Sequence, residues 1–249
     1  MPNKALDTAH ETTNMAAQDH TVKSFDVELR RLVQEIAQMG GLAEEQLAQA
    51  IDALARRDSE AATKVIESDR RIDTMEHDAS NLAVRILALR QPMATDLREV
   101  VAAIKISSDI ERIGDYAKNI AKRALQLNQL GPLRPVSSIP RMGRLAQQIV
   151  KDVLDAYVEK DVALAVAAWR RDEEIDDLYT SLFRELLTYM MEDPRNIGPS
   201  THLLFIAKNI ERIGDHATNI AETVHFLALG RTIDETRPKG DTTNVALDG

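Results

Sequence analysis

Apolar side chains recur along most of the chain at the spacing of an amphipathic helix. In the first part of the chain they repeat about every 3.5 residues, which predicts one long helix with a single buried face. The members of this stripe are Phe25, Leu29, Leu32, Val33, Ile36, Met39, Leu47, Ile51 and Leu54.

Two further helices are predicted before the middle of the chain. Asp58 has the short acceptor side chain of an N-cap and opens a helix that continues to about Leu89. The sequence Arg90-Gln91-Pro92 then interrupts the pattern. Pro92 suits the first turn of a third helix, which runs to about Asn128.

The pattern restarts after a Gly- and Pro-rich segment at 131–135. A fourth helix is predicted over about 139–158, and Asp161 caps a fifth that ends near Met191. Asp193-Pro194 and Gly198-Pro199 indicate a turn, after which a sixth helix runs to Leu229 and stops at Gly230.

Long helices joined by short loops are typical of antiparallel bundles. We therefore predict an all-α fold of two tandem, pseudo-symmetric antiparallel three-helix bundles, at residues 21–130 and 138–230, joined by a linker at 131–137. Residues 1–20 and 231–249 are polar and lack helical periodicity, so both are expected to be disordered tails.

The two halves also match in sequence. Residues 110–121 read IERIGDYAKNIA and residues 210–221 read IERIGDHATNIA, so they differ only at Tyr116/His216 and Lys118/Thr218. Upstream, the N-caps and a pair of aspartates match at an offset of 103 residues instead of 100. Ordered matches of this kind indicate an internal duplication.

Each repeated motif places acidic side chains in a stripe separate from the apolar face. Ser108, Glu111, Asp115 and Asn119 follow one another at three- and four-residue steps, and Glu211, Asp215 and Asn219 repeat the pattern. Like charges one turn apart repel, and a glycine inside a helix costs about 0.5–1 kcal/mol. A cation between the carboxylates would offset the repulsion, and Gly114 and Gly214 would admit a close neighbouring helix.

The preceding helix of each half adds another acidic pair, Asp69 with Asp73 and Asp172 with Asp176. If these faces meet the stripes, four carboxylates converge in each bundle. Two alternatives stay open: the stripes are solvated surfaces, or Asp69 and Asp73 pair with Arg70, Arg71 or Arg112. With oxygen ligands alone, the preferred ions are Mg²⁺, Ca²⁺, Mn²⁺ or iron.

Composition narrows the function classes. The chain has no cysteine, which excludes disulfides and thiolate metal sites. Its formal net charge of −9 argues against nucleic acid as a partner. The first twenty residues contain no apolar signal region and no segment is apolar enough to span a bilayer, so we expect a cytoplasmic protein.

The paired motifs resemble those of the PhoU family, as do Arg90-Gln91-Pro92-Met93-Ala94-Thr95-Asp96-Leu97-Arg98 and the segment 192–197, EDPRNI. The resemblance spans about residues 22–230 and implies metal clusters on the surface of two three-helix bundles. Glu111, Asp115, Glu211 and Asp215 match the family's E-x-x-x-D motif. The implied companions are Asp69, Asp73, Asn119, Asp172, Asp176 and Asn219. Ser108 corresponds to Lys208, so the two sites are expected to differ in affinity.

The resemblance also implies a role. The family silences the phosphate-starvation (Pho) response and restrains phosphate uptake when phosphate is plentiful. The resemblance further implies contact with the ATPase subunit of the phosphate ABC importer (PstB-like) and with a sensor histidine kinase (PhoR-like). A homodimer that reaches the membrane only through its partners is also implied.

Two rival interpretations remain. A di-metal carboxylate oxidase needs inward-facing Glu-x-x-His motifs on two helices, and the helical body offers one, Glu222 with His225. His225 is expected to be an ordinary polar residue near a helix end. No nucleotide-binding loop or nucleophile motif is present, so we expect no enzymatic activity. The other rival is a scaffold with vestigial acidic stripes.

Overall fold

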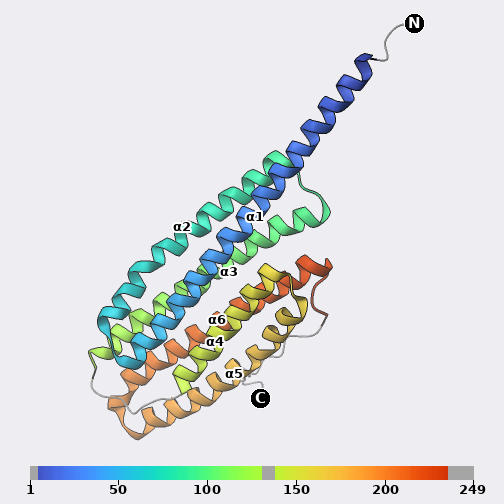
Figure 1. Ribbon diagram of the computed structural model, residues 1–249. Coiled ribbons are helices and arrows are strands. Elements are labelled where there is room, and N and C mark those ends of the chain that lie inside the picture. The colour runs from blue at the N-terminus through green and yellow to red at the C-terminus, as the bar shows by residue number, and fades with distance from the viewer. Residues whose placement is uncertain (1–4, 131–137, 235–249) are drawn as a thin grey trace.

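The computed structural model describes residues 5–130 and 138–234, with side chains from residue 25 onward. The first half consists of α1 (Ala5–Arg56), α2 (Ser59–Arg90) and α3 (Ala94–Asn128). The second half consists of α4 (Ser138–Glu159), α5 (Val162–Glu192), the 3-10 turn η1 (Pro194–Asn196) and α6 (Ile197–Leu229). Each half is an antiparallel three-helix bundle, so the predicted fold class is confirmed (Figure 1).

The helix starts follow local hydrogen-bond chemistry. Asp58 accepts a hydrogen bond from the Ala61 amide at 2.9 Å, and Asp161 accepts from the amides of Ala163 and Leu164. Both are therefore the N-caps that the sequence predicts. Gly230 ends α6 with a φ of 71°, and its amide donates to the carbonyl of Phe226.

Three boundaries differ from the prediction. Pro92 precedes the N-cap Met93 and lies outside α3, whereas Gly198 and Pro199 lie in the first turn of α6, where proline is tolerated. The helix α1 begins at Ala5, so most of the segment expected to be a disordered tail is helical. Residues 5–20 contain neither Gly nor Pro, and extending an existing helix adds one hydrogen bond per residue. The predicted linker and the segment 235–249 lie outside the described residues.

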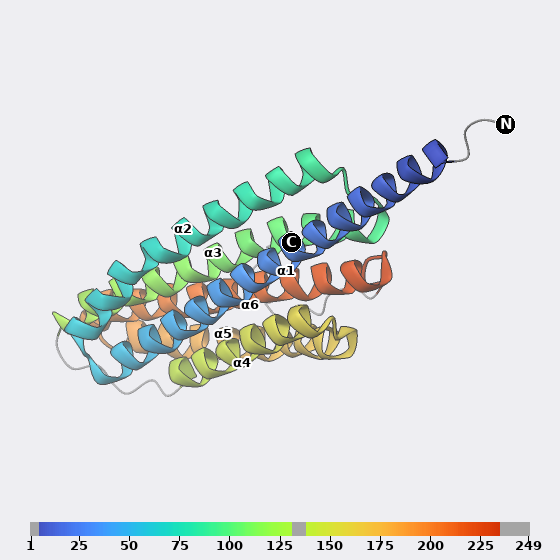
Figure 2. The same cartoon turned by 45° about the horizontal axis from the view of Figure 1, so that its top comes forward.

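The two bundles pack against each other through α3 and α6, which run side by side in opposite directions (Figures 1 and 2). Isoleucine and alanine dominate this core, and Ile106, Ile110, Ile113 and Ile120 of α3 are fully buried. At the surface of this interface, His216 Nδ1 lies 2.8 Å from Asp109 Oδ1. An extended, mostly aliphatic seam therefore fixes α3 against α6.

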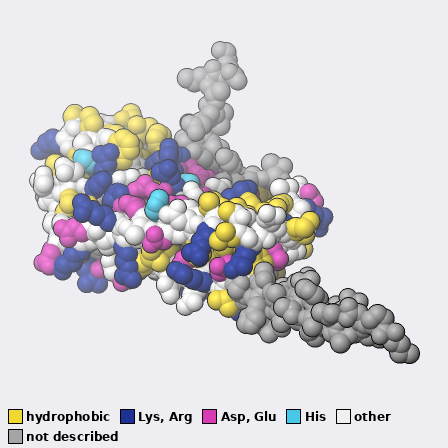
Figure 3. Space-filling model, turned by 90° about the horizontal axis from the view of Figure 1, so that it is seen from above, with side chains coloured by type: hydrophobic (Ala, Val, Ile, Leu, Met, Phe, Trp, Pro, Cys, Tyr) yellow, Lys and Arg dark blue, Asp and Glu magenta, His cyan; other side chains and the backbone are white. Residues whose placement is uncertain are grey.

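A second contact joins α1 to α4. A Cβ atom at Gly40 would lie 2.7 Å from Leu154 Cδ2, and one at Gly143 would lie 2.7 Å from Ile51 Cδ1. Glycine at these two positions therefore lets the helices approach closely. None of the described helices has the length and apolar character needed to cross a membrane. On the face shown in Figure 3, basic and acidic side chains are interspersed.

Candidate functional site

In the first bundle, the carboxylates of α2 and α3 lie close together, which is one of the alternatives that the sequence left open. Lys118 Nζ donates hydrogen bonds to Asp69 of α2 and, at 2.6 Å, to Asp115 Oδ1 of α3. Burial raises the pKa of Glu111, and the nearby charges of Asp115 and Asp73 raise it further. Burial likewise raises the pKa of Asp73, with Asp69 as the next cause. The charges of these four carboxylates therefore affect one another's pKa values.

The second bundle repeats this arrangement between α5 and α6. Glu211 is only 7% exposed, and burial raises its pKa. A hydrogen bond from Lys208 lowers that pKa in part, while the charges of Asp215 and Asp176 raise it. Asp172 and Asp176 are both buried. This site is the more deeply enclosed of the two.

The repeated glycines admit the neighbouring helix, as the sequence suggests. A Cβ atom at Gly114 would lie 3.0 Å from Ile72 Cδ1 and 3.1 Å from Gln46 Oε1. A Cβ atom at Gly214 would lie 2.2 Å from Asp172 Oδ1. Glycine is therefore what allows the acidic face of α5 to reach α6, and the requirement is stricter in the second bundle.

Lys118 gives the first site a cation of its own. Its side chain is 20% exposed and lies between Asp69 and Asp115. Burial lowers the pKa of Lys118, but hydrogen bonds to Asp115 and Asp69 outweigh burial, so the pKa is raised overall and the ammonium stays charged. The sequence hypothesis that Asp69 or Asp73 pairs with Arg70, Arg71 or Arg112 is wrong in its partner, because Lys118 pairs with Asp69.

At the corresponding position of the second bundle, Thr218 is buried and neutral. Its hydroxyl donates to the backbone carbonyl of Asp215 at 2.7 Å. A lysine is present here too, since Lys208 Nζ donates to Glu211 Oε1 at 2.8 Å. That contact leaves Glu211 Oε2 buried and without a hydrogen-bond partner among the described residues.

Ser108 and the two asparagines lie at the boundary between the two bundles. Ser108 and Asn219 line a groove between α3 and α6, and Asn119 lines a second groove between the same helices. The helix geometry explains this, because each four-residue step turns by about 40° beyond one full turn. A stripe of such steps drifts around the helix, so Asn119 and Asn219 line these grooves. Their role as metal companions stays a prediction.

An oxygen-ligated metal ion needs several donor atoms that converge on one point. Within residues 25–130 and 138–234, no three Asp, Glu or His side chains have their donor atoms arranged to share one ion. The chemistry of the second site nevertheless fits a hard cation, because it combines buried carboxylates with the unsatisfied Glu211 Oε2. The first site fits less well, because Lys118 already supplies a positive charge between two of its carboxylates.

Comparison with known proteins gives the family. The model of the PhoU domain matches residues 36–124 and 139–224, one match in each half of the chain. The chain belongs to the PhoU family. Its PhoU domains together contain all ten residues proposed as ligands.

The matches to relatives in this family span nearly the whole length of each relative. The phosphate-specific transport system accessory protein PhoU homolog of Caulobacter vibrioides is 55% identical over 224 residues, which is 90% of this chain and 97% of the relative. The crystal structure of PhoU from Pseudomonas aeruginosa is 41% identical, with a TM-score of 0.81 over 83% of this chain and 100% of that one. The phosphate transport system regulatory protein PhoU from Streptococcus pneumoniae is 32% identical, with a TM-score of 0.78 over 85% and 100%.

The oxidase alternative finds no support in the PhoU fold seen here. Glu222 accepts a hydrogen bond from Trp169 Nε1 at 3.0 Å, and His225 Nδ1 lies 2.9 Å from the carbonyl oxygen of Arg231. Both side chains are therefore engaged in separate structural contacts. They do not form one half of a di-metal centre.

Two site residues escaped the sequence reasoning. Lys118 is one of the two differences between the repeated motifs, and it lies three residues after Asp115, so its spacing was the available signal. Gln46 of α1 donates from Nε2 to Asp69 Oδ1 at 3.2 Å. No local pattern marks Gln46, because its contact joins positions 23 residues apart.

Proposed function

We propose that this chain is a non-enzymatic, cytoplasmic regulator that restrains phosphate uptake and silences the phosphate-starvation (Pho) response. Membership of the PhoU family carries the proposal. The relatives are named phosphate-specific transport system accessory proteins, which supports a role beside the phosphate transporter. In this role the chain couples the ATPase subunit of the phosphate ABC importer (PstB-like) to a sensor histidine kinase (PhoR-like), as a homodimer.

The deciding experiment for the regulatory role is genetic. Deletion of the gene is expected to switch on a phosphate-starvation reporter in phosphate-rich medium, and the wild-type gene on a plasmid is expected to silence it again. An unchanged reporter in the deletion strain would contradict the proposal. A reporter that responds while phosphate uptake stays normal would remove the claim that uptake is restrained.

The second part of the proposal is a metal site on the second bundle. Asp172 and Asp176 of α5 and Glu211 and Asp215 of α6 would hold Mg²⁺, Mn²⁺, Ca²⁺ or iron, and the ion would add positive charge beside that of Lys208. The buried, unsatisfied Glu211 Oε2 supports this assignment. In the first bundle the ammonium of Lys118 already offsets part of the charge of Asp69 and Asp115, so we expect weaker binding there.

Metal analysis of untagged protein tests this part. Bound Mn, Fe, Mg and Ca are measured in the wild type, in Glu211→Ala/Asp215→Ala and in Glu111→Ala/Asp115→Ala. The first double variant is expected to lose most of the metal, and the second is expected to retain it. Equal, near-zero metal in all three proteins would remove the metal proposal and leave the regulatory role to the genetic test.

A further inference from the structure

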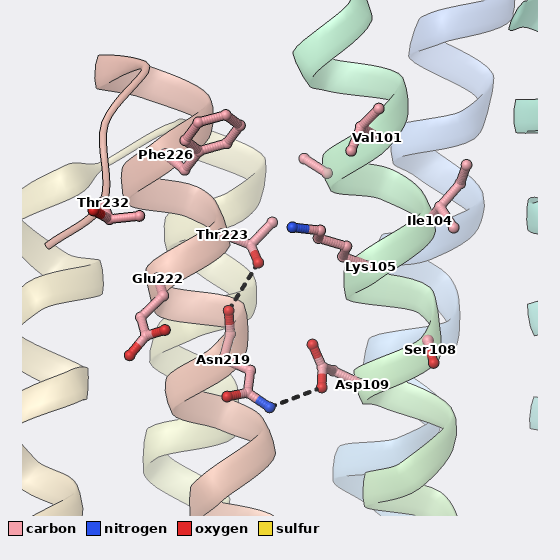
Figure 4. Close-up of a pocket in the computed structure, with 11 residues that line it drawn as sticks. Val101, Ile104, Lys105, Ser108, Asp109, Asn219, Glu222, Thr223, Phe226 and Thr232 are labelled. Carbon is pink, nitrogen blue, oxygen red and sulfur yellow. Dashed lines mark hydrogen bonds between the residues drawn. The ribbon is translucent and has the colours of Figure 1, made fainter. Parts of the chain in front are cut away.

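The seam between α3 and α6 carries two grooves that the duplication relates to each other. The first, with a volume of about 660 Å³, is lined among others by Lys105, Asp109, Asn219, Glu222 and Thr223 (Figure 4). The second, of about 550 Å³, is lined by six residues at the matching positions 100 earlier or later and by Leu125. The six are Asn119, Lys122, Arg123, Gln126, Phe205 and Asn209. We name them the acidic groove and the basic groove.

The two grooves differ in charge. The lining of the acidic groove has two carboxylates, Asp109 and Glu222, and one cation, Lys105. In the basic groove the corresponding positions hold Asn209, Lys122 and Phe205, and Arg123 replaces Thr223. The basic groove therefore has two cations and no carboxylate in its lining, on a chain whose net charge is −9.

The two carboxylates of the acidic groove are satisfied within the protein. Asp109 accepts from Asn219 Nδ2 at 3.2 Å and lies 2.8 Å from His216 Nδ1, and Glu222 accepts from Trp169. Figure 4 shows Asp109 and Asn219 pointing toward each other across the groove. This groove has the polar contacts of an ordinary helix interface.

The cations of the basic groove have no such partners. Among the described residues, neither Lys122 nor Arg123 lies within 4.0 Å of a carboxylate oxygen, although many surface cations of this chain form ion pairs within one helix turn. The guanidinium of Arg123 stacks on the ring of Phe205, 4.3 Å from its centroid, and contacts His202. Burial and the charge of Arg123 lower the pKa of His202, so this imidazole is neutral at pH 7 and leaves Arg123 without a charged partner.

Stacking holds the guanidinium plane while its edge can still donate hydrogen bonds. Arginine donates to phosphate oxygens through this planar fork, and lysine adds a point charge. The side-chain amides of Asn119 and Gln126 border the same groove and supply further donors. A small anion also avoids most of the overall negative charge, because interactions between exposed charges fade beyond about 8–10 Å at physiological salt.

We propose that the basic groove binds the phosphate group of a small anion, either inorganic phosphate or the phosphate of a nucleotide. The site does not depend on the regulatory role or on a metal, because it is argued from Lys122, Arg123 and the amides beside them. It lies on the seam between the bundles, so an occupied groove would bridge α3 and α6.

Equilibrium titration of the full chain with inorganic phosphate, and separately with ATP, tests the site. The decisive variant is Lys122→Glu/Arg123→Thr. It gives the basic groove the residue types that Glu222 and Thr223 provide in the acidic groove. It is expected to weaken binding by at least about tenfold, the equivalent of roughly 1.4 kcal/mol. Lys105→Ala removes a cation from the acidic groove and is the matched control, with unchanged binding expected.

The single variant Lys122→Glu separates loss of binding from loss of folding. Lys122 is exposed, and its replacement leaves the Arg123–Phe205 stack in place. It is expected to keep the wild-type melting temperature and still weaken binding several-fold. Saturation by phosphate alone identifies the free ion as ligand, and saturation by ATP alone identifies a nucleotide. Absence of saturable binding for both, or equal binding by the wild type and the double variant, would overturn the proposal.

Discussion

The acidic sites of the two bundles descend from one sequence and solve the same electrostatic problem differently. In the first, Lys118 places an ammonium between Asp69 and Asp115, so part of the carboxylate charge is neutralised within the protein. In the second, neutral Thr218 stands at that position, and Glu211 is more buried than its counterpart. A duplicated site can therefore keep its acidic motif while the lysine beside it changes position, from Lys118 in the first bundle to Lys208 in the second.

The largest effect on stability is expected from removing the internal cation. Lys118→Thr leaves buried Asp69 without its ammonium and should lower the free energy of unfolding of the metal-free protein by about 2–3 kcal/mol. Urea denaturation measures it. Lys122→Thr on the same helix removes an exposed lysine with no ion pair and is the control, expected to change stability by less than about 0.5 kcal/mol. Equal effects of the two variants would contradict the role given to Lys118.

The pH dependence of this difference has a definite sign. Because the pKa of Lys118 is raised above its ordinary value of 10.5, its stabilising contribution is complete below pH 10.5 and is lost as the pH rises through the raised value. The gap between the wild type and Lys118→Thr should therefore stay constant from pH 7 to about pH 9. It should narrow above about 10.5. A gap that already closes between pH 7 and 9 would indicate another cause.

A smaller effect is expected from the glycines that admit the neighbouring helix. Gly214→Ala forces a Cβ atom against Asp172 and should destabilise the protein by about 1–2 kcal/mol. Gly114→Ala meets only contacts of 3.0 Å or longer, and the better helix propensity of alanine offsets about 1 kcal/mol of the strain. Thermal unfolding of the two variants measures the difference. If Gly114→Ala were the more destabilising of the two, the tighter packing assigned to the second site would be wrong.

The smallest effect concerns Glu111. Its raised pKa means that the ionised carboxylate weakens the metal-free fold above that pKa, and this penalty disappears as the pH falls toward the ordinary value of 4.5. Glu111→Gln should therefore raise the free energy of unfolding by about 0.5 kcal/mol at pH 7 and leave it unchanged below about pH 4.5. Denaturation curves at both pH values measure this. A loss of stability at pH 7 would show that Glu111 is stabilised by its surroundings.

The features that depend on local chemistry could be predicted from the sequence. Asp58 and Asp161 are recognisable caps because each bonds amides two or three residues away, and the apolar stripes predict the bundles because their period is local. The meeting of Asp69 with the third helix was one of the alternatives that the sequence left open. Gln46 could not be placed, because its partner Asp69 lies on another helix. The i,i+3 spacing of Asp115 and Lys118 was a usable signal, but the contact of Lys118 with Asp69 joins two helices. Asn119 and Asn219 line grooves between α3 and α6, because four-residue steps drift around the helix.

Exchange of Lys118 and Thr218 between the two sites tests the central claim most directly. Bound Mn²⁺ is measured by equilibrium dialysis for the wild type, Lys118→Thr and Thr218→Lys, with circular dichroism to check that each is folded. We predict that Thr218→Lys weakens Mn²⁺ binding by at least about tenfold, whereas Lys118→Thr gains Mn²⁺ in the first bundle. Folded variants that both bind as much Mn²⁺ as the wild type, with the same affinity, would contradict the claim that Lys118 takes the place of a metal ion.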